Sequence, residues 1–219
     1  MTRLTRERIA EQDRYLLIRQ TQYRIAADVV TAALSRFDEV EAIALFGSVA
    51  RPLWREVPRF SEFRRTQVKV WHECKDMDLA VWLSRLDRLQ QLNRARNISS
   101  QGIFIMHGFG VANHEVDVFL LQPQTNRYLG RLCNFAQCPK GKRECEVPGC
   151  GREAFLRQHE DFEFWSNALD RCVMLYRRGE GIIRRAAELP AQDQELQDAA
   201  RSSPSHNSDA SSPARRTTL

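Results

Sequence analysis

The stretch that decides the fold is Glu39-Val40-Glu41-Ala42-Ile43-Ala44-Leu45-Phe46-Gly47-Ser48. Its apolar part predicts a buried β-strand, because a short apolar run that ends at a turn signal is typical of a strand inside a sheet. Gly47 permits a sharp turn, and Ser48 is a residue type that often caps a helix, so we expect a helix to begin through residues 50–51. A strand, a glycine turn and a helix start therefore follow one another directly.

Two further predicted strands carry acidic residues. Residues 76–83 are apolar apart from Asp76 and Asp78, and residues 114–121 contain Asp117. Side chains two positions apart in a strand lie on one face, separated by roughly 6 to 7 Å of backbone, so Asp76 and Asp78 point to one place. Pairing of the two strands would bring Asp117 beside them. We therefore expect a cluster of three carboxylates.

Such a cluster needs a cation. Three neighbouring carboxylates repel one another by roughly several kcal/mol at low effective dielectric, and hard oxygen ligands favour Mg²⁺ or Mn²⁺. The Gly47-Ser48 turn adds a hydroxyl and, at the expected helix start, free backbone N–H groups that suit a triphosphate. Two metals about 3.5 to 4 Å apart would bridge the α-phosphate to an attacking hydroxyl. Asp117 is then placed to take the proton of that hydroxyl.

Three motifs in this order resemble those of the polymerase-beta-type nucleotidyltransferase superfamily, especially its minimal bacterial members: Phe46-Gly47-Ser48-Val49-Ala50-Arg51, Asp76-Met77-Asp78-Leu79 and Val116-Asp117-Val118. The resemblance covers roughly residues 40–121 and implies an α/β (α+β) fold, a mixed sheet flanked by helices. It also implies that Gly47 and Ser48 bind the nucleoside triphosphate and that Asp76 and Asp78 bind two Mg²⁺ ions. Asp117 would be a further metal ligand and the base.

Other positions near these motifs have two readings. Arg51 is expected to contact a phosphate or, as an arginine in the first turn of a helix, to form a surface ion pair. Pro52 and Lys75 stand where minimal members usually have glycine and serine, and the connection between the first two motifs is longer than usual. We predict helix plus loop for residues 52–70, which form either an acceptor-binding flap or a solvated insertion. Five basic residues lie in it: Arg55, Arg59, Arg64, Arg65 and Lys69.

The remaining elements are expected from apolar spacing. Residues 5–37 and 86–95 show helical three- and four-residue steps, whereas residues 102–107 resemble a strand that Gly108-Phe109-Gly110 joins to the next. Together with the motifs, these elements predict one domain over residues 1–122, a normal domain size.

Beyond Pro123 we expect a second region, residues 123–189, with a cysteine-rich loop and a helix over residues 155–176, and then a disordered tail over residues 190–219. Four thiolates in the loop are spaced to close a structural Zn²⁺ site, which would make a scaffold or partner surface; free thiols, disulfides or an iron–sulfur cluster are the alternatives. These residues are Cys133, Cys138, Cys145 and Cys150.

Composition and the N-terminal sequence narrow the class of protein and its expected compartment. Of 219 residues 42% are hydrophobic, and no run approaches the length of a membrane span. A charged segment follows the basic N-terminus where a secretory signal would be apolar, so a cytoplasmic protein with reduced thiols is expected. The net charge of +5, from 33 basic and 28 acidic residues, fits a mixed-charge surface as well as a site for a polyanion.

The sequence thus supports two hypotheses. The first is a Mg²⁺-dependent nucleotidyltransferase that moves a nucleoside monophosphate from a triphosphate, with ATP favoured, to a hydroxyl of a protein side chain, a small molecule or an RNA end. The second is a non-catalytic nucleotide-binding or zinc-stabilised interaction protein with a regulatory role. A component of a toxin–antitoxin pair would fit either.

Overall fold

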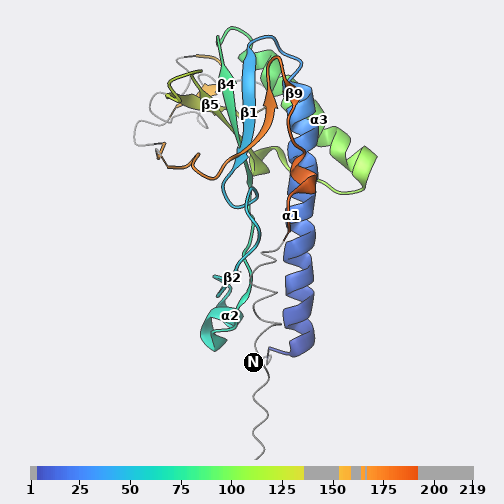
Figure 1. Ribbon diagram of the computed structural model, residues 1–219. Helices are drawn as coiled ribbons and strands as arrows, with labels where there is room; N and C mark the ends of the chain where they lie inside the picture. The colour runs from blue at the N-terminus through green and yellow to red at the C-terminus, as the bar shows by residue number, and fades with distance from the viewer. Residues whose placement is uncertain (1–3, 136–152, 159–163, 166, 192–219) are drawn as a thin grey trace, which may run out of the picture.

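The computed structural model describes residues 4–135, 153–158, 164–165 and 167–191 (Figure 1). It is a mixed α+β fold with few helices, in which one seven-stranded sheet has the order β7-β6-β5-β4-β1-β8-β9 and a separate pair joins β2 to β3. Only the pairing of β4 with β5 is parallel among the described strand pairs. In chain order the elements are α1 (Arg6–Leu34), β1 (Val40–Phe46), β2 (Arg55–Glu56), α2 (Ser61–Thr66), β3 (Val70–Trp71), β4 (Met77–Leu83), α3 (Leu89–His107), η1 (Asn113–Glu115), β5 (Val116–Leu121), β6 (Tyr128–Leu132), β7 (Leu156–Arg157), β8 (Val173–Arg177), β9 (Gly181–Ile182) and η3 (Ala186–Glu188).

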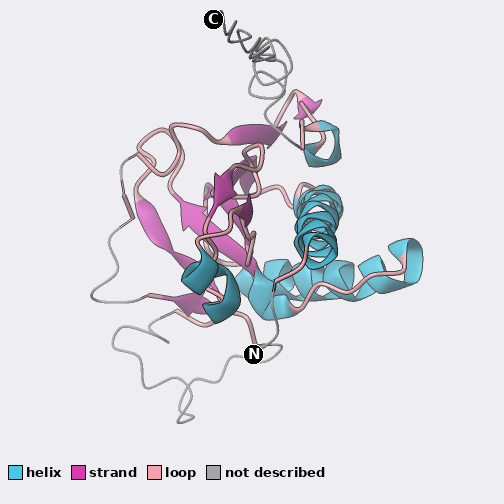
Figure 2. Ribbon diagram, turned by 90° about the horizontal axis from the view of Figure 1, so that it is seen from below, coloured by secondary structure: helices cyan, strands magenta, loops and turns pink. Residues whose placement is uncertain are grey.

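Helices α1 and α3 cover one face of the large sheet (Figure 2). Alternate strand residues such as Ile43 and Leu79 point to that face and pack with α1 residues such as Val30 in the main core. The other face carries a smaller aromatic cluster built around Phe46 and Phe119. The sheet therefore has a helix-covered face and a second face without a described helix.

Helix α1 begins where the sequence predicts it. The Thr5 hydroxyl accepts a hydrogen bond from the Arg8 backbone N–H at 3.3 Å, which satisfies one of the free N–H groups of the first turn. The first half of α1 extends past the sheet, where Leu16 packs on Phe63 of α2 and Val70 of β3 (Figure 1). The connection between the first two motifs thus forms a small unit of its own against α1.

Three predictions about secondary structure are wrong. Residues 102–107 are the end of α3, not a strand: the helix continues because Ile103 is fully buried at helical spacing, and it ends at Gly108, whose φ is 73°. Residues 155–176 do not form the expected C-terminal helix, since β7 and β8 lie there. β8 pairs with the free edge of β1, and this tertiary pairing outweighs the local helical pattern.

The third error concerns the chain after Ser48. Residues 47–50 form turns, and the Arg51 backbone N–H donates to the Ser48 carbonyl at 3.4 Å. The proposed helix start at this point is therefore absent from the described structure, and no phosphate argument can use its dipole.

The sheet joins residues from both sides of Pro123. β6 pairs with β5, and β8 pairs with β1. None of the described helices combines the length and the apolar character needed to cross a membrane. The predicted tail from residue 192 onward lies outside the described residues.

Candidate metal centre

Three carboxylates meet at one end of the parallel strand pair. In the β4–β5 register Asp78 lies directly opposite Asp117, and Asp76 stands just before β4. One ligand oxygen from each of the three residues lies within 4.8 Å of the other two. The structure therefore brings together the three acidic residues that the sequence places on two separate segments.

The negative charge of this cluster is reflected in its proton affinities. Burial, and then the nearby charges of Asp76 and Asp117, raise the pKa of Asp78 to about 7. Burial followed by the charge of Asp117 also raises the pKa of Asp76. Asp76 and Asp78 thus hold protons more tightly than ordinary carboxylates do, and a bound cation would favour their charged forms.

Arg131 of β6 is a member of this site that sequence reasoning missed. Its guanidinium donates a hydrogen bond to the Asp117 carboxylate and lies 4.9 Å from the ring centre of Phe119. Its charge also lowers the pKa values of Asp76 and Asp78, although less than burial raises them. The segment around Arg131 was not predicted as a strand, so nothing in the sequence pattern placed it near Asp117.

Gly47 lies against the cluster. Phe46, the last residue of β1, is paired with Asp78, and Gly47 turns away from the strand with a φ of 74°. A Cβ atom at Gly47 would clash with Oδ2 of Asp78 and would lie 3.4 Å from its Cγ. Glycine is therefore required both by the backbone conformation and by the close approach of the carboxylate.

The turn after Gly47 is fixed by α1. The buried Arg24 side chain donates hydrogen bonds to the Val49 carbonyl and the Arg51 carbonyl, both at 3.0 Å. Gln20 donates a third hydrogen bond, to the Arg51 carbonyl at 2.8 Å. Ser48, at the centre of this turn, hydrogen-bonds Cys74 and so lowers the pKa of that thiol, which burial raises. The turn is held rigidly although no helix follows it.

Arg51 is part of a stack. Its guanidinium lies 4.7 Å from the ring centre of Trp54, and Trp54 stacks on His72 at 3.7 Å. Glu56 accepts a hydrogen bond from Trp54 Nε1 at 3.1 Å, and a carboxylate oxygen of Glu56 lies 2.9 Å from His72 Nδ1. The stack therefore joins the insertion, residues 52–70, to His72 in the segment that leads to Asp76.

A pocket of about 470 Å³ opens beside the stack and reaches two motif residues, Ser48 and Asp76. The insertion supplies its other wall through residues 56–59, and the approach to β4 supplies residues 72, 73 and 75. Two cations, Arg59 and Lys75, line it beside the carboxylates of Glu56, Glu73 and Asp76, and within the described part of the chain neither cation has an ion-pair partner. The insertion therefore borders the motifs directly.

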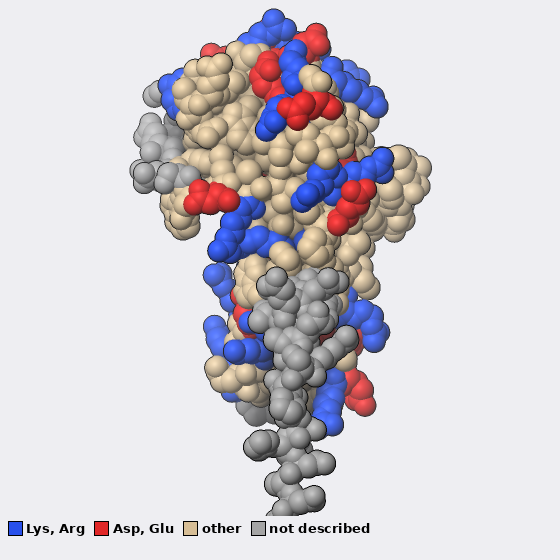
Figure 3. Space-filling view, in the orientation of Figure 1, with Lys and Arg blue, Asp and Glu red and all other residues tan. Residues whose placement is uncertain are grey.

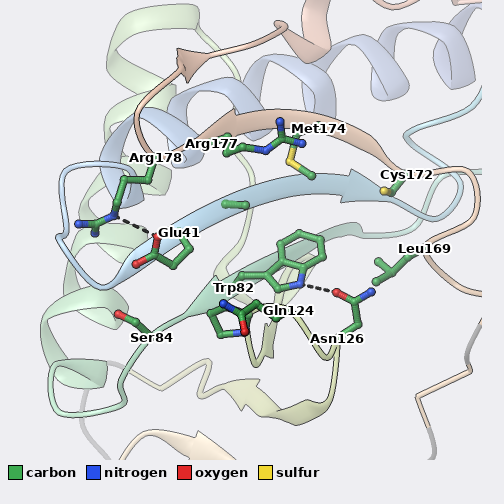
Figure 4. A pocket seen from close by; sticks show the side chains of 12 residues that line it. Glu41, Trp82, Ser84, Gln124, Asn126, Leu169, Cys172, Met174, Arg177 and Arg178 are labelled. Atoms are coloured by element: carbon green, nitrogen blue, oxygen red, sulfur yellow. Dashed lines mark hydrogen bonds and ion pairs between the residues drawn. The ribbon is translucent and has the colours of Figure 1, made fainter.

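A second pocket, of about 890 Å³, lies on the same face of the sheet as Asp78 but farther along the strands (Figure 4). Its floor residue Trp82 follows Asp78 by four positions, a distance of about 13 Å along a strand. Trp82 Nε1 donates to Asn126 at 2.7 Å, and Arg178 pairs with Glu41 at 3.4 Å. The metal-ligand candidates do not line this pocket, so it is separate from the acidic cluster.

The predicted zinc loop is mostly outside the described residues. Cys138, Cys145 and Cys150 fall in that part of the chain, and Cys133 is buried just after β6, where its backbone N–H donates to the Phe155 carbonyl at 2.8 Å. The Zn²⁺ site stays a prediction.

The site as described combines three clustered carboxylates, a glycine turn that touches one of them, and a pocket with two cations. Comparisons of the chain with protein-family models, with curated proteins and with solved structures found no match.

Proposed function

We propose that this protein is a nucleotidyltransferase that moves a nucleoside monophosphate from a nucleoside triphosphate, with ATP favoured, to a hydroxyl acceptor. The observation that carries the proposal is the position of Asp78. Its carboxylate lies between Asp117 on the neighbouring parallel strand and Gly47 of the turn, so one residue joins a metal-ligand cluster to a glycine turn whose backbone a phosphate could approach closely.

The donor set fits a hard divalent cation. Asp76, Asp78 and Asp117 offer carboxylate oxygens only, within 4.8 Å of one another, and oxygen ligands of this kind suit Mg²⁺ or Mn²⁺. The raised pKa of Asp78 supports the same conclusion, because burial and two neighbouring carboxylates disfavour its charge. A bound divalent metal would supply neutralisation of phosphate charge and a lowered pKa for the attacking hydroxyl.

In the proposed arrangement the two substrates lie on opposite sides of β4. Ser48 follows β1 and Asp117 belongs to β5, and these strands flank β4 on opposite sides. The triphosphate would therefore lie on the β1 side, where the Ser48 hydroxyl can donate to a phosphate oxygen and Arg59 and Lys75 can offset its charge. The acceptor would approach from the β5 side.

The chain's own residues then account for the transfer. The acceptor oxygen forms a bond to the α-phosphorus while the bond from that phosphorus to the pyrophosphate oxygen breaks. Asp117 takes the proton of the acceptor hydroxyl, and Ser48 and the two cations hold the departing pyrophosphate. The phosphates and the proton are thus each assigned to described side chains.

One observation favours the second candidate function, nucleotide binding without turnover. Asp117 is hydrogen-bonded to Arg131, and an arginine in this position partly replaces the charge that a metal would bring. A protein that keeps this ion pair would bind a nucleotide and release no product.

The decisive experiment uses the full chain with α-phosphate-labelled ATP, Mg²⁺ and three classes of acceptor: lysate proteins, lysate small molecules and total RNA. We expect release of pyrophosphate and label in one class, with a loss of at least about 100-fold in D78N and D117N. The control is D87N, since Asp87 is an exposed residue that pairs with Arg85 away from the site. ATP binding without pyrophosphate in any class would establish the second candidate, and turnover that survives D78N would refute the mechanism.

A further inference from the structure

A groove runs along the outer side of α1. Its lining residues do not include the three clustered carboxylates. Two pockets, of about 730 and 410 Å³, share the α1 residues Val29 and Ala32. The α1 residues that line them recur at three- and four-residue steps, so they form one stripe on the helix. They are Ile25, Asp28, Val29, Thr31, Ala32 and Ala33, and Arg36 lines the groove from the turn just after the end of α1. The floor of the groove is thus formed mostly by apolar side chains, several of them small.

The walls are apolar as well. Ile98 and Met106 of α3 line one pocket, and Ile182 of β9 lines the other, while α1, α3 and β9 lie close together in the fold (Figure 1). These side chains are unusually exposed for their type: Ile98 is 56% exposed, Met106 61% and Ile182 51%. Ile105, one residue before Met106, is 85% exposed. Contiguous apolar surface of this kind marks an interaction site more often than a free surface.

The charges at the two ends of the groove are positive. Arg36 and Arg88 line one pocket, and Arg184 and Arg185 line the other. The one acidic lining residue, Asp28, accepts hydrogen bonds from the Ala186 and Ala187 backbone N–H groups, at 2.6 and 3.0 Å. Arg88 pairs with Glu39 at 3.4 Å, but no described carboxylate forms an ion pair with the other three arginines. The face drawn in Figure 3 carries Lys and Arg side chains intermixed with Asp and Glu side chains.

We propose that this groove binds an amphipathic helix of a partner protein whose apolar face is bordered by acidic residues. The α1 part of the floor, from Ile25 to Ala33, spans about 12 Å, so about two turns of helix fit along it. Apolar side chains of the partner would lie over Val29 and Ala32, and its carboxylates would meet the arginines at the ends.

Two other occupants fit less well. In a symmetric dimer the same patch faces itself, so the unpaired arginines of one copy would meet those of the other with no acidic residue to offset them. The segment after Ala191 contains only two aliphatic residues larger than alanine, Leu196 and Leu219, which lie too far apart in the chain to fill an apolar groove of two turns together. Charge and composition therefore favour a separate acidic helix.

The test compares A32E with A10E in the full chain. Both substitutions put a glutamate on an exposed alanine of the same helix, but Ala32 lies in the groove and Ala10 lies outside it. The probes are two labelled 18-residue synthetic helices with the same leucine face, one flanked by glutamates and the other by lysines. Fluorescence anisotropy measures their binding, and light scattering measures the mass of each variant.

We expect the glutamate helix to bind at least about tenfold more tightly than the lysine helix, an advantage that decreases as salt is added. A32E and the double variant R36E/R184E should each weaken that binding by about tenfold or more, whereas A10E should leave it unchanged. Equal binding of both helices, binding of neither, or an effect of A10E equal to that of A32E would overturn the proposal. So would a dimer of the native chain that A32E separates into monomers, because the occupant would then be a second copy.

Discussion

At the scale of single residues, the contact between Gly47 and Asp78 links the two halves of the proposed site. The pKa of Asp78 is raised to about 7, and Gly47, which has no side chain, leaves room for the Asp78 carboxylate. A change at either position should therefore affect both local stability and ligand binding.

The first prediction compares G47A with G108A. Both glycines have nearly the same positive φ, 74° and 73°, but a Cβ at Gly108 would meet nothing within 4 Å, whereas one at Gly47 would clash with Asp78. G108A should cost about 1 kcal/mol from backbone strain alone, and G47A at least about 1 kcal/mol more. Urea unfolding measures the difference, and equal costs would show that the Asp78 contact is not tight.

The second prediction concerns pH. The pKa of Asp78 is raised from 3.8 to about 7 in the folded chain, so the folded state holds a proton that the unfolded state releases. Without divalent metal, this residue therefore stabilises the fold below about pH 4, and the contribution is lost as pH rises through about 7. D78N lacks that loss and should be more stable than the native chain at pH 8 by about 4 kcal/mol, with little difference at pH 4.

The measurement is urea unfolding of D78N and of the native chain at both pH values with a chelator present. Added Mg²⁺ should stabilise the native chain at pH 8 and should leave D78N nearly unchanged. A constant difference between the two proteins across the pH range would contradict the raised pKa.

At the scale of elements, α1 supports the turn that carries Ser48. Its buried Arg24 reaches the carbonyls of Val49 and Arg51 and, from the other end of the described chain, those of Leu189 and Pro190 at 2.7 and 3.1 Å. One arginine thus joins the turn after β1 to the segment after η3.

The third prediction follows from these four acceptors. R24M keeps much of the side-chain volume but leaves several buried carbonyl groups without a donor, so we expect a loss of about 3 kcal/mol in unfolding free energy and weaker ATP binding. R14M, an exposed arginine on the same helix, should change stability by less than about 0.5 kcal/mol. Chemical denaturation and ATP titration test both variants. A similar loss in R14M would mean that the effect comes from helix propensity.

The sequence predicted the elements that have a simple pattern. β1, β4 and β5 were expected because each is an apolar run next to a turn signal, and the two carboxylate strands pair as proposed. Residues 102–107 were misassigned because Gly-Ile-Phe-Ile-Met is rich in β-branched and aromatic residues, although the helix before them continues. Arg131 could not be predicted, since its place beside Asp117 depends on a pairing of β6 with β5 that no local pattern encodes.

At the scale of the whole molecule, one sheet holds the first and last parts of the described chain. β1 lies between β4 and β8, so its second edge is covered by residues that follow Pro123 by about fifty positions. The core also includes Leu132, Leu175 and Ala186 beside residues of α1 and β1. Residues up to 122 therefore lack part of the hydrophobic core and two neighbouring strands.

The fourth prediction is that a fragment of residues 1–122 does not fold stably, whereas a chain that ends at Ala191 does. The short fragment exposes the edges of β1 and β5, while the longer one keeps every contact made by the described residues. Circular dichroism with thermal unfolding separates the outcomes. A cooperative transition in the short fragment would establish residues 1–122 as an independent domain.

The same sheet order has a consequence for the time course of folding. β1 lies between β4 and β8, and β8 is synthesised long after β1. Pairing between segments so distant in the chain is slow, because a long loop must close first. Arg24, which donates to the carbonyls of the turn after Gly47, also donates to those of Leu189 and Pro190, so its full set of hydrogen bonds forms only after the segment that follows β8 has left the ribosome. In pulsed hydrogen exchange we expect the amides of α1 to be protected early and those of β1 and the Gly47 turn to be among the last. The proposed nucleotide site would then be completed only after β8 and the segment through Pro190 have been synthesised.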